Sequence, residues 1–576
     1  MTNNNQKLEL TWVGKDNPEY DISNIEPRIL EEDQKLSNCK NDPNTENMII
    51  HGDNLLALKA LLPEYEGKVK CIYIDPPYNT GNAFEHYDDS VEHSTWLSLM
   101  KPRLELLKLL LSSDGIIFVQ IDDIEQAYLK ILMDEVFGRN NFVSMLVIES
   151  GEVFGTKAAH LDKTFVKVKD YVLAYFRDNS KRGKFKTLYT KTSEVFDTHY
   201  GVYLSDNLEK ISLIDFLGNI NWVKKLFDKY GYRMSLSNVT KVMELEEEFR
   251  SFINLKISKN IFQDQPFSRN LDEETLKQFE SKKIININGD YLFKTSSGSI
   301  RYYQSFFEAI HETSDYNSEV CRSTARGDLW KNYHIDMRNV DGEGGVKFKS
   351  SKKPERLIKD ILNVYTNTSD LVLDSFLGSG TTAAVAHKMQ RKYIGIEMGD
   401  HAYTHCKVRL DNVINGIDQT GISKAVDWKG GGAYKFYELA PSFITKDEFG
   451  NPVIDGFYND AKLIKAMCKL MNFTYQPSLT EYWKHGLGQG KNYLYVTTQL
   501  LTVGMIQQIV AHLGSGESLI ICPKKYEPGA EKVDNRVTIK KIPQSVLKAC
   551  HFGKKEYLLP IKENSMEEIE VEEDNE

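Results

Sequence analysis

The chain has 576 residues, of which 41% are hydrophobic and 27% charged, a composition typical of a globular protein with three to four domains. Its seven cysteines include no C-x-x-C pair, which argues against a disulfide scaffold and favours the reducing cytoplasm. The first residues lack a signal-peptide pattern, and no apolar run has the length that crosses a bilayer, so a membrane protein is not expected.

The net charge of −10 does not exclude a nucleic-acid binder, because the charges are unevenly distributed. Residues 562–576 contain eight acids and one lysine, a net of −7, and we expect an acidic disordered tail over 563–576. Residues 151–330, by contrast, have a net charge of about +2. Since a phosphate backbone responds to the local surface rather than to the overall charge, binding to DNA stays open.

Residues 1–45 are polar, and we expect an N-terminal arm that packs on the main domain through Trp12, Ile29 and Leu30. The segment 48–54 predicts a short strand and a turn, followed by a helix over 55–62 that stops at a proline. Asp53 lies at the end of this strand, where it can bind a polar ligand group or cap the helix. The sequence leaves both roles open.

The stretch CIYIDPPY at 71–78 is the first landmark. Its apolar part predicts a buried strand, and Pro76 and Pro77 end that strand with a rigid backbone. Asp75 and Tyr78 therefore stand at the carboxyl end of a strand, where ligands bind in open α/β sheets. The Asp75 carboxylate and the Pro76 carbonyl can accept both hydrogens of an exocyclic amine while the Tyr78 ring stacks on its heterocycle. The alternative from these residues alone is a structural Pro-Pro turn.

Further elements of the same half follow in order. Residues 79–89 predict a loop over the site, and 95–111 have the periodicity of a helix. A strand over 116–121 and a helix from about 122 to 137 complete a half-domain that we place at 46–148.

An inserted domain is expected over 149–330, where lysines alternate with aromatic residues, as in KRGKFK at 181–186. This combination suits contact with phosphates together with grooves or bases. Charge runs are more often solvated surfaces, so the pattern alone is weak.

The second landmark lies in a half-domain placed at 331–428. A helix starting at Pro354 precedes a strand over 371–374, a glycine turn FLGSG at 376–380, a helix over 381–389 and a strand ending in Glu397. Strand, glycine turn, helix, strand and acid together predict a site for an adenosine-containing cofactor. The third glycine of the dinucleotide fingerprint and the lysine of a P-loop are absent. Hydroxyls at Ser379, Thr381 and Thr382 suit a small carboxylate better than a pyrophosphate. This favours S-adenosylmethionine, because the methionine end of that cofactor is a carboxylate.

The two landmarks together resemble the amino-group DNA methyltransferases. The catalytic motif DPPY precedes the cofactor motif FLGSG, with a long insert between them, as in the β class of that family. The sequence around Asn54, at 80–82 and at 353–355 is similar to that of the modification (Mod) subunits of type III restriction–modification systems. The resemblance implies an α/β fold: a permuted Rossmann-like, S-adenosylmethionine-dependent methyltransferase domain with an inserted target-recognition domain.

The resemblance also implies roles for single residues. Asp75 accepts from the N6 amine of a flipped adenine, Pro76 and Pro77 shape the motif, and Tyr78 stacks on the base. The cofactor-binding set is Asp53, Asp75, Lys353, Pro354, Asp374, Phe376, Gly378, Ser379, Gly380, Thr381, Thr382 and Glu397. Glu397 is expected at the ribose, Asp53 on the adenine side, and Lys353 with Pro354 beside the methionine end.

The resemblance implies three partners: double-stranded DNA, a second copy of the chain and a helicase–nuclease restriction subunit. Three alternatives stay open: a DNA-binding specificity subunit with little activity of its own, an orphan methyltransferase without a nuclease partner, and a nicotinamide oxidoreductase. The last would leave the Asp75 motif without a role.

The C-terminal part follows a glycine linker at 429–432. We expect a small α/β domain over 433–562, with strands at 494–496 and 519–522 and a helix at 505–513 between them. It contains no catalytic motif, and a role in dimer formation, in holding a partner or in capping the core is equally compatible with it. His401 and His405 lie one helical turn apart but have no third ligand in view, which favours a surface pair over a metal site.

Overall fold

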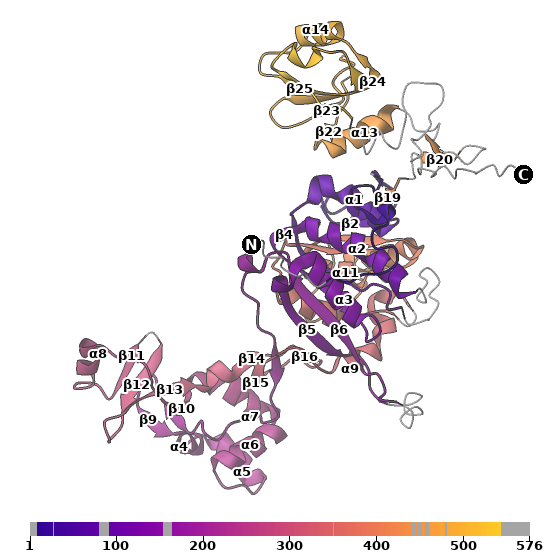
Figure 1. Ribbon diagram of the computed structural model, residues 1–576. Helices are drawn as coiled ribbons and strands as arrows, with labels where there is room; N and C mark the ends of the chain where they lie inside the picture. Colours follow the sequence, from indigo (N-terminus) through magenta and orange to yellow (C-terminus); the bar gives the residue numbers. More distant parts are fainter. Residues whose placement is uncertain are drawn as a thin grey trace, which may run out of the picture. The chain divides into compact units, whose positions relative to one another are not determined.

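The computed structural model in Figure 1 divides into two compact units, one formed by Met1–Lys184 with Met337–Glu576 and one by Phe185–Asp336. The structure describes residues 9–26, 28–79, 92–153, 164–287, 289–348, 351–440, 444–446, 452–454, 460–478 and 481–542. The predicted loop at 79–89 beyond Asn79 and the predicted tail at 563–576 lie outside these ranges. Within them, no helix is both long enough and apolar enough to cross a membrane.

The first unit is built on a large sheet. Its strands lie in the order β1 (Leu30–Glu32), β19 (Lys435–Leu439), β2 (Met48–His51), β18 (Lys392–Glu397), β17 (Leu371–Asp374), β3 (Val69–Ile74), β4 (Leu111–Ile121), β6 (Lys169–Phe176) and β5 (Phe142–Glu149). From β19 to β4 every neighbouring pair is parallel, whereas β6 runs antiparallel to β4 and β5. The strands of the second sequence half stand beside β3 of the first, so the permuted α/β fold is confirmed.

Helices cover this sheet in two groups. The first group, α1 (Asn54–Tyr65), α2 (His93–Leu110) and α3 (Gln126–Met133), belongs to the first sequence half, and α10 (Glu355–Asn363), α11 (Thr381–Lys388) and α12 (Val408–Ile414) belong to the second. The core beneath α1 and α2 is fully apolar; Leu58, Ile72, Leu104 and Val119 are completely buried in it. Helix α1 continues two residues beyond Pro63, the predicted stop, so this proline lies inside the helix, where it cannot donate to the Lys59 carbonyl. As predicted, Trp12 and Leu30 pack on this core.

The domain limits differ from those expected. The inserted unit begins at Phe185 rather than 149, because β5 and β6 pair with β4 and complete the main sheet; it ends at Asp336 rather than 330. Likewise, the C-terminal region does not begin at 433. Strand β19, which follows the glycine linker, pairs with β2 and β1 and therefore belongs to the main sheet.

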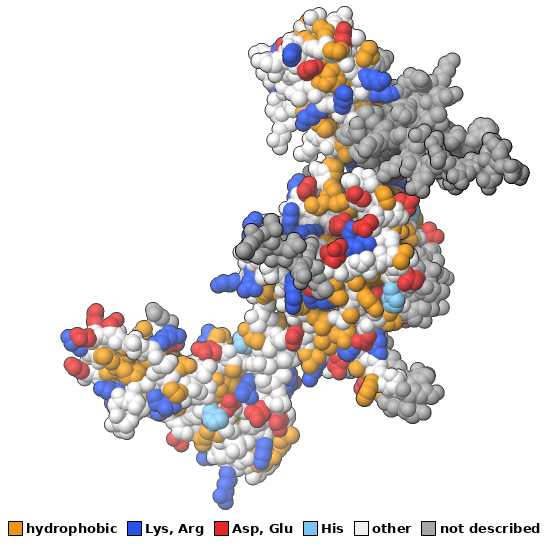
Figure 2. Space-filling view, in the orientation of Figure 1, with side chains coloured by type: hydrophobic (Ala, Val, Ile, Leu, Met, Phe, Trp, Pro, Cys, Tyr) orange, Lys and Arg blue, Asp and Glu red, His pale blue; other side chains and the backbone are white. Residues whose placement is uncertain are grey.

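The inserted unit has a sheet in the order β11 (Ile284–Ile287), β12 (Asp290–Lys294), β13 (Ile300–Ser305), β10 (Ile261–Pro266), β8 (Val202–Leu204) and β9 (Lys210–Ser212). A second sheet joins β14 (Ile310–Glu312), β15 (Val320–Ala325) and β7 (Tyr189–Lys191). Helices α4 (Leu213–Gly218), α5 (Asn221–Lys229), α6 (Leu236–Leu245) and α7 (Glu247–Ser251) enclose a separate core that includes Val239 and Phe249. Within Phe185–Asp336 there are 20 lysines and arginines and 22 acids. Figure 2 shows the two signs mixed on the face in view.

The C-terminal part has its own sheet in the order β22 (Thr474–Tyr475), β23 (Gly486–Leu487), β24 (Asn492–Leu501), β25 (Ser518–Tyr526) and β26 (Val537–Ile539). Strands β24, β25 and β26 are parallel, and α14 (Val503–Ala511) connects the first two, as predicted. Another helix, α13 (Asp460–Leu470), precedes this sheet.

Candidate active site

Five acidic side chains stand along one edge of the main sheet. Strands β2, β18, β17, β3 and β4 are adjacent and parallel, so their carboxyl ends lie at the same edge. In that order, the strands end in or are closely followed by Asp53, Glu397, Asp374, Asp75 and Asp122. The sheet therefore assembles four of the predicted site acids, together with Asp122, from sequence positions up to about 340 residues apart. Such a row suits a ligand that has positive charge and hydroxyl or amine donors.

The Asp75 carboxylate is bonded from both sides. Its Oδ1 accepts from the Tyr78 hydroxyl at 2.7 Å, and its Oδ2 accepts from the Lys353 ammonium at 2.6 Å. Trp96 Nε1 donates to the Pro77 carbonyl at 2.8 Å and fixes the turn between them. The Pro-Pro segment therefore holds Asp75 and Tyr78 in fixed positions.

The residue after this motif has a strained backbone that a buried acid holds in place. Asn79 has a φ of 59°, in the left-handed region, and its Nδ2 donates to Glu125 Oε1 at 2.6 Å. His93 Nδ1 lies 2.7 Å from the same oxygen, and Glu125 is fully buried. Neither Glu125 nor His93 was predicted as a site residue, because each contributes through the fold and not through a local pattern.

Burial dominates the ionisation of the motif. Desolvation raises the pKa of Asp75, and the nearby Lys353 ammonium and the Tyr78 hydrogen bond counteract part of that effect. Desolvation and the Asp75 charge hold the pKa of Tyr78 well above its usual range, so its hydroxyl stays protonated. Lys353 Nζ lies 4.9 Å and Lys167 Nζ 5.7 Å from the centroid of the Tyr78 ring.

The glycine turn is closed by Glu397 from the next strand. Gly378 and Gly380 have φ values of 54° and 78°, which glycine adopts without steric cost. The Gly378 amide donates to Glu397 Oε2 at 2.7 Å and the Gly399 amide to Oε1 at 3.0 Å. Phe376, also in the turn, is buried. Glu397 thus shapes the turn, and its carboxylate oxygens have lone pairs left for a ligand.

The hydroxyls of this region are already engaged within the protein. Thr382 Oγ1 donates to Asp374 Oδ2 at 2.6 Å, while Ser379 Oγ and Thr381 Oγ1 are 2.9 Å apart. Arg409 Nη1 donates to Thr381 Oγ1 at 2.7 Å. These three hydroxyls order the turn and the start of α11; their contact with a carboxylate stays a prediction.

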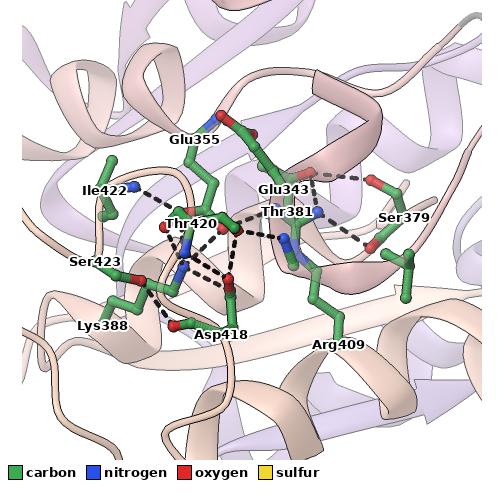
Figure 3. A network of polar contacts seen from close by, with 12 residues as sticks. Glu343, Glu355, Ser379, Thr381, Lys388, Arg409, Asp418, Thr420, Ile422 and Ser423 are labelled. Atoms are coloured by element: carbon green, nitrogen blue, oxygen red, sulfur yellow. Dashed lines mark hydrogen bonds and ion pairs between the residues drawn. The ribbon is translucent and has the colours of Figure 1, made fainter. Parts of the chain in front are cut away.

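A buried ionic cluster lies behind the turn (Figure 3). Glu355 accepts from Lys388 Nζ at 2.8 Å and from Arg409 Nη2 at 2.8 Å, and Asp418 lies 2.7 Å from Lys388 Nζ. The side chains of Glu355, Lys388 and Arg409 are 0% exposed, so water does not compensate their charges. Arg409 connects this cluster to Thr381, the first residue of α11 after the glycine turn.

The two ends of the predicted cofactor set have structural roles as well. Asp53 caps α1 by accepting from the Leu56 amide at 3.1 Å, and Arg103 Nη2 lies 3.3 Å from its other oxygen. Pro354 stands immediately before α10, with a φ of −72°. The cap that the sequence offered for Asp53 is therefore present, and its ligand role stays a prediction.

His401 and His405 do not form part of a metal site in the described ranges, where no group of three or more His, Cys, Asp or Glu is arranged to hold an ion. His405 Nε2 lies 2.9 Å from the Lys347 carbonyl, and Phe348 contacts both rings edge-on.

Comparisons with known proteins match the region that holds this site. A model of the DNA methylase family matches residues 69–407. The chain is 37% identical over 421 residues to the "Probable type III restriction-modification enzyme HindVI Mod subunit" of Haemophilus influenzae, covering 69% of this chain and 54% of that protein. It is 27% identical over 432 residues to the EcoPI Mod subunit of Escherichia phage P1, covering 68% and 62%. The EcoP15I Mod subunit of Escherichia coli is 24% identical over 509 residues, covering 77% and 73%. The chain thus spans little more than half the length of the first of these relatives.

The ionic cluster generates a stability prediction. Replacing Glu355 with Gln leaves Lys388 and Arg409 with reduced compensation inside the protein, and breaking a buried pair costs about 3–5 kcal/mol. We expect urea denaturation to show a loss of that size in the free energy of unfolding. Glu64→Gln, at an exposed position of α1, is the matched control and should change stability by less than about 0.5 kcal/mol. A loss below about 1 kcal/mol for Glu355→Gln would contradict the role of the cluster.

Asp374 generates a prediction on pH. Burial raises the pKa of Asp374 to about 7, and the charges of Asp75 and Glu397 add to the shift. The folded chain therefore holds a proton that the unfolded chain loses near pH 4, so this contribution to stability is full below about pH 4 and declines as the pH rises to about 7. Relative to that of Asp374→Asn, the free energy of unfolding of the wild type should fall by up to about 4 kcal/mol as the pH rises across that window. Urea denaturation at a series of pH values measures the difference, and a flat difference would refute the assignment.

Proposed function

The chain belongs to the DNA methylase family, and on that premise we propose that it transfers a methyl group from S-adenosylmethionine to N6 of a flipped adenine in duplex DNA. The observation that supports this most directly is the placement of Asp75 and Tyr78 beside the glycine turn, on the adjacent strands β3 and β17. Such a base must leave the duplex to reach a motif at the edge of a sheet.

The motif residues act by position and charge. The Asp75 carboxylate and the Pro76 carbonyl accept the two amine hydrogens, which favours a tetrahedral nitrogen and stabilises the positive charge that develops on it. Tyr78 holds the base by stacking. The cofactor supplies an electrophilic methyl group: the C–N bond forms as the S–C bond breaks, and the surplus N6 proton leaves to water. No strong base is required of the protein.

The carboxylates at the sheet edge suit this cofactor because they are negatively charged and accept hydrogen bonds. The cofactor has a sulfonium charge, ribose hydroxyls and an adenine amine. We assign Glu397 to the ribose and Asp53 to the adenine side. Pro354 and the hydroxyls of Ser379, Thr381 and Thr382 belong to the methionine end. The resemblance places Lys353 there as well, although its ammonium is bonded to Asp75. Asp374, Phe376, Gly378 and Gly380 line the same pocket.

We further propose that the protein is the modification subunit of a type III restriction–modification system, works in the bacterial cytoplasm and forms a homodimer. The HindVI, EcoPI and EcoP15I relatives are Mod subunits of type III restriction–modification enzymes, which supports this assignment. A restriction subunit with helicase and nuclease activities is then its partner. The unit at Phe185–Asp336 is the element that we assign to target recognition.

Replacing Asp75 with Ala tests the reaction. The variant loses the acceptor for the amine, and we expect methyl transfer from labelled S-adenosylmethionine to fall at least about 100-fold. Bacterial DNA that lacks adenine methylation is the substrate, and sequencing that reports modified bases identifies the base and its context. Glu64→Ala should leave the rate unchanged. Label in cytosine, or equal label with Asp75→Ala, would refute the proposal.

Replacing Gly380 with Ala tests the cofactor pocket. Its φ of 78° and a new Cβ only 3.0 Å from the Cys406 Cα oblige the turn to move. We expect the Kd for S-adenosylmethionine, measured by calorimetry, to rise about 5- to 30-fold, since left-handed alanine costs about 1–2 kcal/mol. Gly342→Ala, where a Cβ meets open space, is the matched control. An unchanged Kd for Gly380→Ala would remove the turn from the cofactor site.

A further inference from the structure

Lys353 joins the two halves of the site. It lies just before α10, its carbonyl accepts from Thr381 Oγ1 at 3.3 Å, and its ammonium lies 2.6 Å from Asp75 Oδ2. The Lys353 and Asp75 side chains are 13% and 17% exposed, so this ion pair is largely withdrawn from water. One lysine therefore contacts the cofactor turn through its backbone and the catalytic carboxylate through its side chain.

We infer that Lys353 is a positioning residue that keeps the Asp75 carboxylate ionised and orients its Oδ1 toward the target amine. The inference rests on the proposed methyl transfer and deepens it. It differs from the role that the resemblance implies for Lys353, which is contact with the methionine end of the cofactor.

The chemistry of the amine requires an ionised Asp75. A carboxylate only accepts hydrogen bonds, whereas a protonated carboxyl has a hydroxyl that would face the amine hydrogens as a second donor. The ammonium bond fixes Oδ2, and Oδ1 is the oxygen that faces Tyr78. Because each carboxylate oxygen has two lone pairs, Oδ1 can accept from the amine beside the Tyr78 hydroxyl.

The charged groups around Asp75 show which cation favours its ionisation. The groups that act most strongly on Asp75 are Lys353, Tyr78 and Asp170, and Tyr73 and Asp374 also interact with its charge. Lys167 Nζ lies 5.7 Å from the centroid of the Tyr78 ring. The Asp170 charge opposes ionisation of Asp75, and so does Asp374 once it has lost its proton. Lys167 is already paired with Asp122 at 2.9 Å and with Asp170 at 3.3 Å. Among the described residues, Lys353 is thus the cation that bonds directly to Asp75.

The pH dependence of methyl transfer distinguishes this role from cofactor binding. An opposite charge within about 4–6 Å lowers the pKa of a carboxyl by about 1–3 units. Lys353→Met should therefore move the acid limb of the single-turnover rate upward by at least about one pH unit, at saturating S-adenosylmethionine and DNA. Lys353→Arg, which keeps the charge, should restore the limb. Lys347→Met, from the same connecting segment but exposed, should leave the profile unchanged.

Each outcome decides one question. A Lys353→Met rate that is reduced equally at every pH, or that recovers when S-adenosylmethionine is raised further, would overturn the inference in favour of a structural or cofactor-binding role. If Lys353→Met unfolds in a thermal melt, Lys353→Gln serves as the uncharged variant with the same expectation. Absence of transfer by the wild type would overturn the proposed function, whereas wild-type transfer with an unshifted limb in both uncharged variants overturns this inference alone.

Discussion

The site depends on the parallel pairing of β17 with β3. Val372 aligns with Cys71 and Leu373 with Ile72, across a separation of about 300 residues in the sequence. This pairing brings Asp374 beside Asp75 and the glycine turn beside the Pro-Pro motif. It also lies at the point where strand order reverses in the sheet, the position at which open α/β sheets bind ligands. Without this register, the two motifs would be separate turns without a common ligand.

Charges that are buried behind the site hold that geometry at a cost in desolvation. Glu355, Lys388 and Arg409 are removed from water, and their mutual attraction offsets the loss of hydration only while every partner stays in place. Arg409 extends the cluster to Thr381, and Lys353 stands two residues before Glu355. The cluster therefore couples the position of the cofactor turn to that of the lysine at Asp75, so that the two sequence halves meet in one arrangement.

Much of this could be predicted from the sequence, because the informative features are local. A strand that ends in Asp-Pro-Pro-Tyr and a glycine turn followed by a helix determine their own backbone, so the positions of Asp75, Tyr78 and Gly380 followed from pattern. The contacts of Lys353, Glu125 and Glu355 did not, since each depends on tertiary packing. The domain limits differ from the predicted ones for the same reason: β6 and β19 lie inside the stretches predicted as the inserted and C-terminal domains, and only their pairing partners assign them to the main sheet.

The electrostatics of the site constrain how DNA can approach it. A row of acids at the carboxyl edge of the sheet favours a cationic ligand but repels phosphates, and the inserted unit contains slightly more acidic than basic residues. Under the proposed methyl transfer, the DNA backbone is held by local groups of lysines and arginines away from this edge, and a neutral base enters it at low electrostatic cost. Lys353 pairs with Asp75, and Lys167 pairs with Asp122 and Asp170, so these two cations offset the carboxylates nearest to the Tyr78 ring, on which the proposed base stacks. The charge pattern thus fits the proposed extrusion of a single base better than insertion of the duplex, and this restriction follows from the same strand ends that create the site.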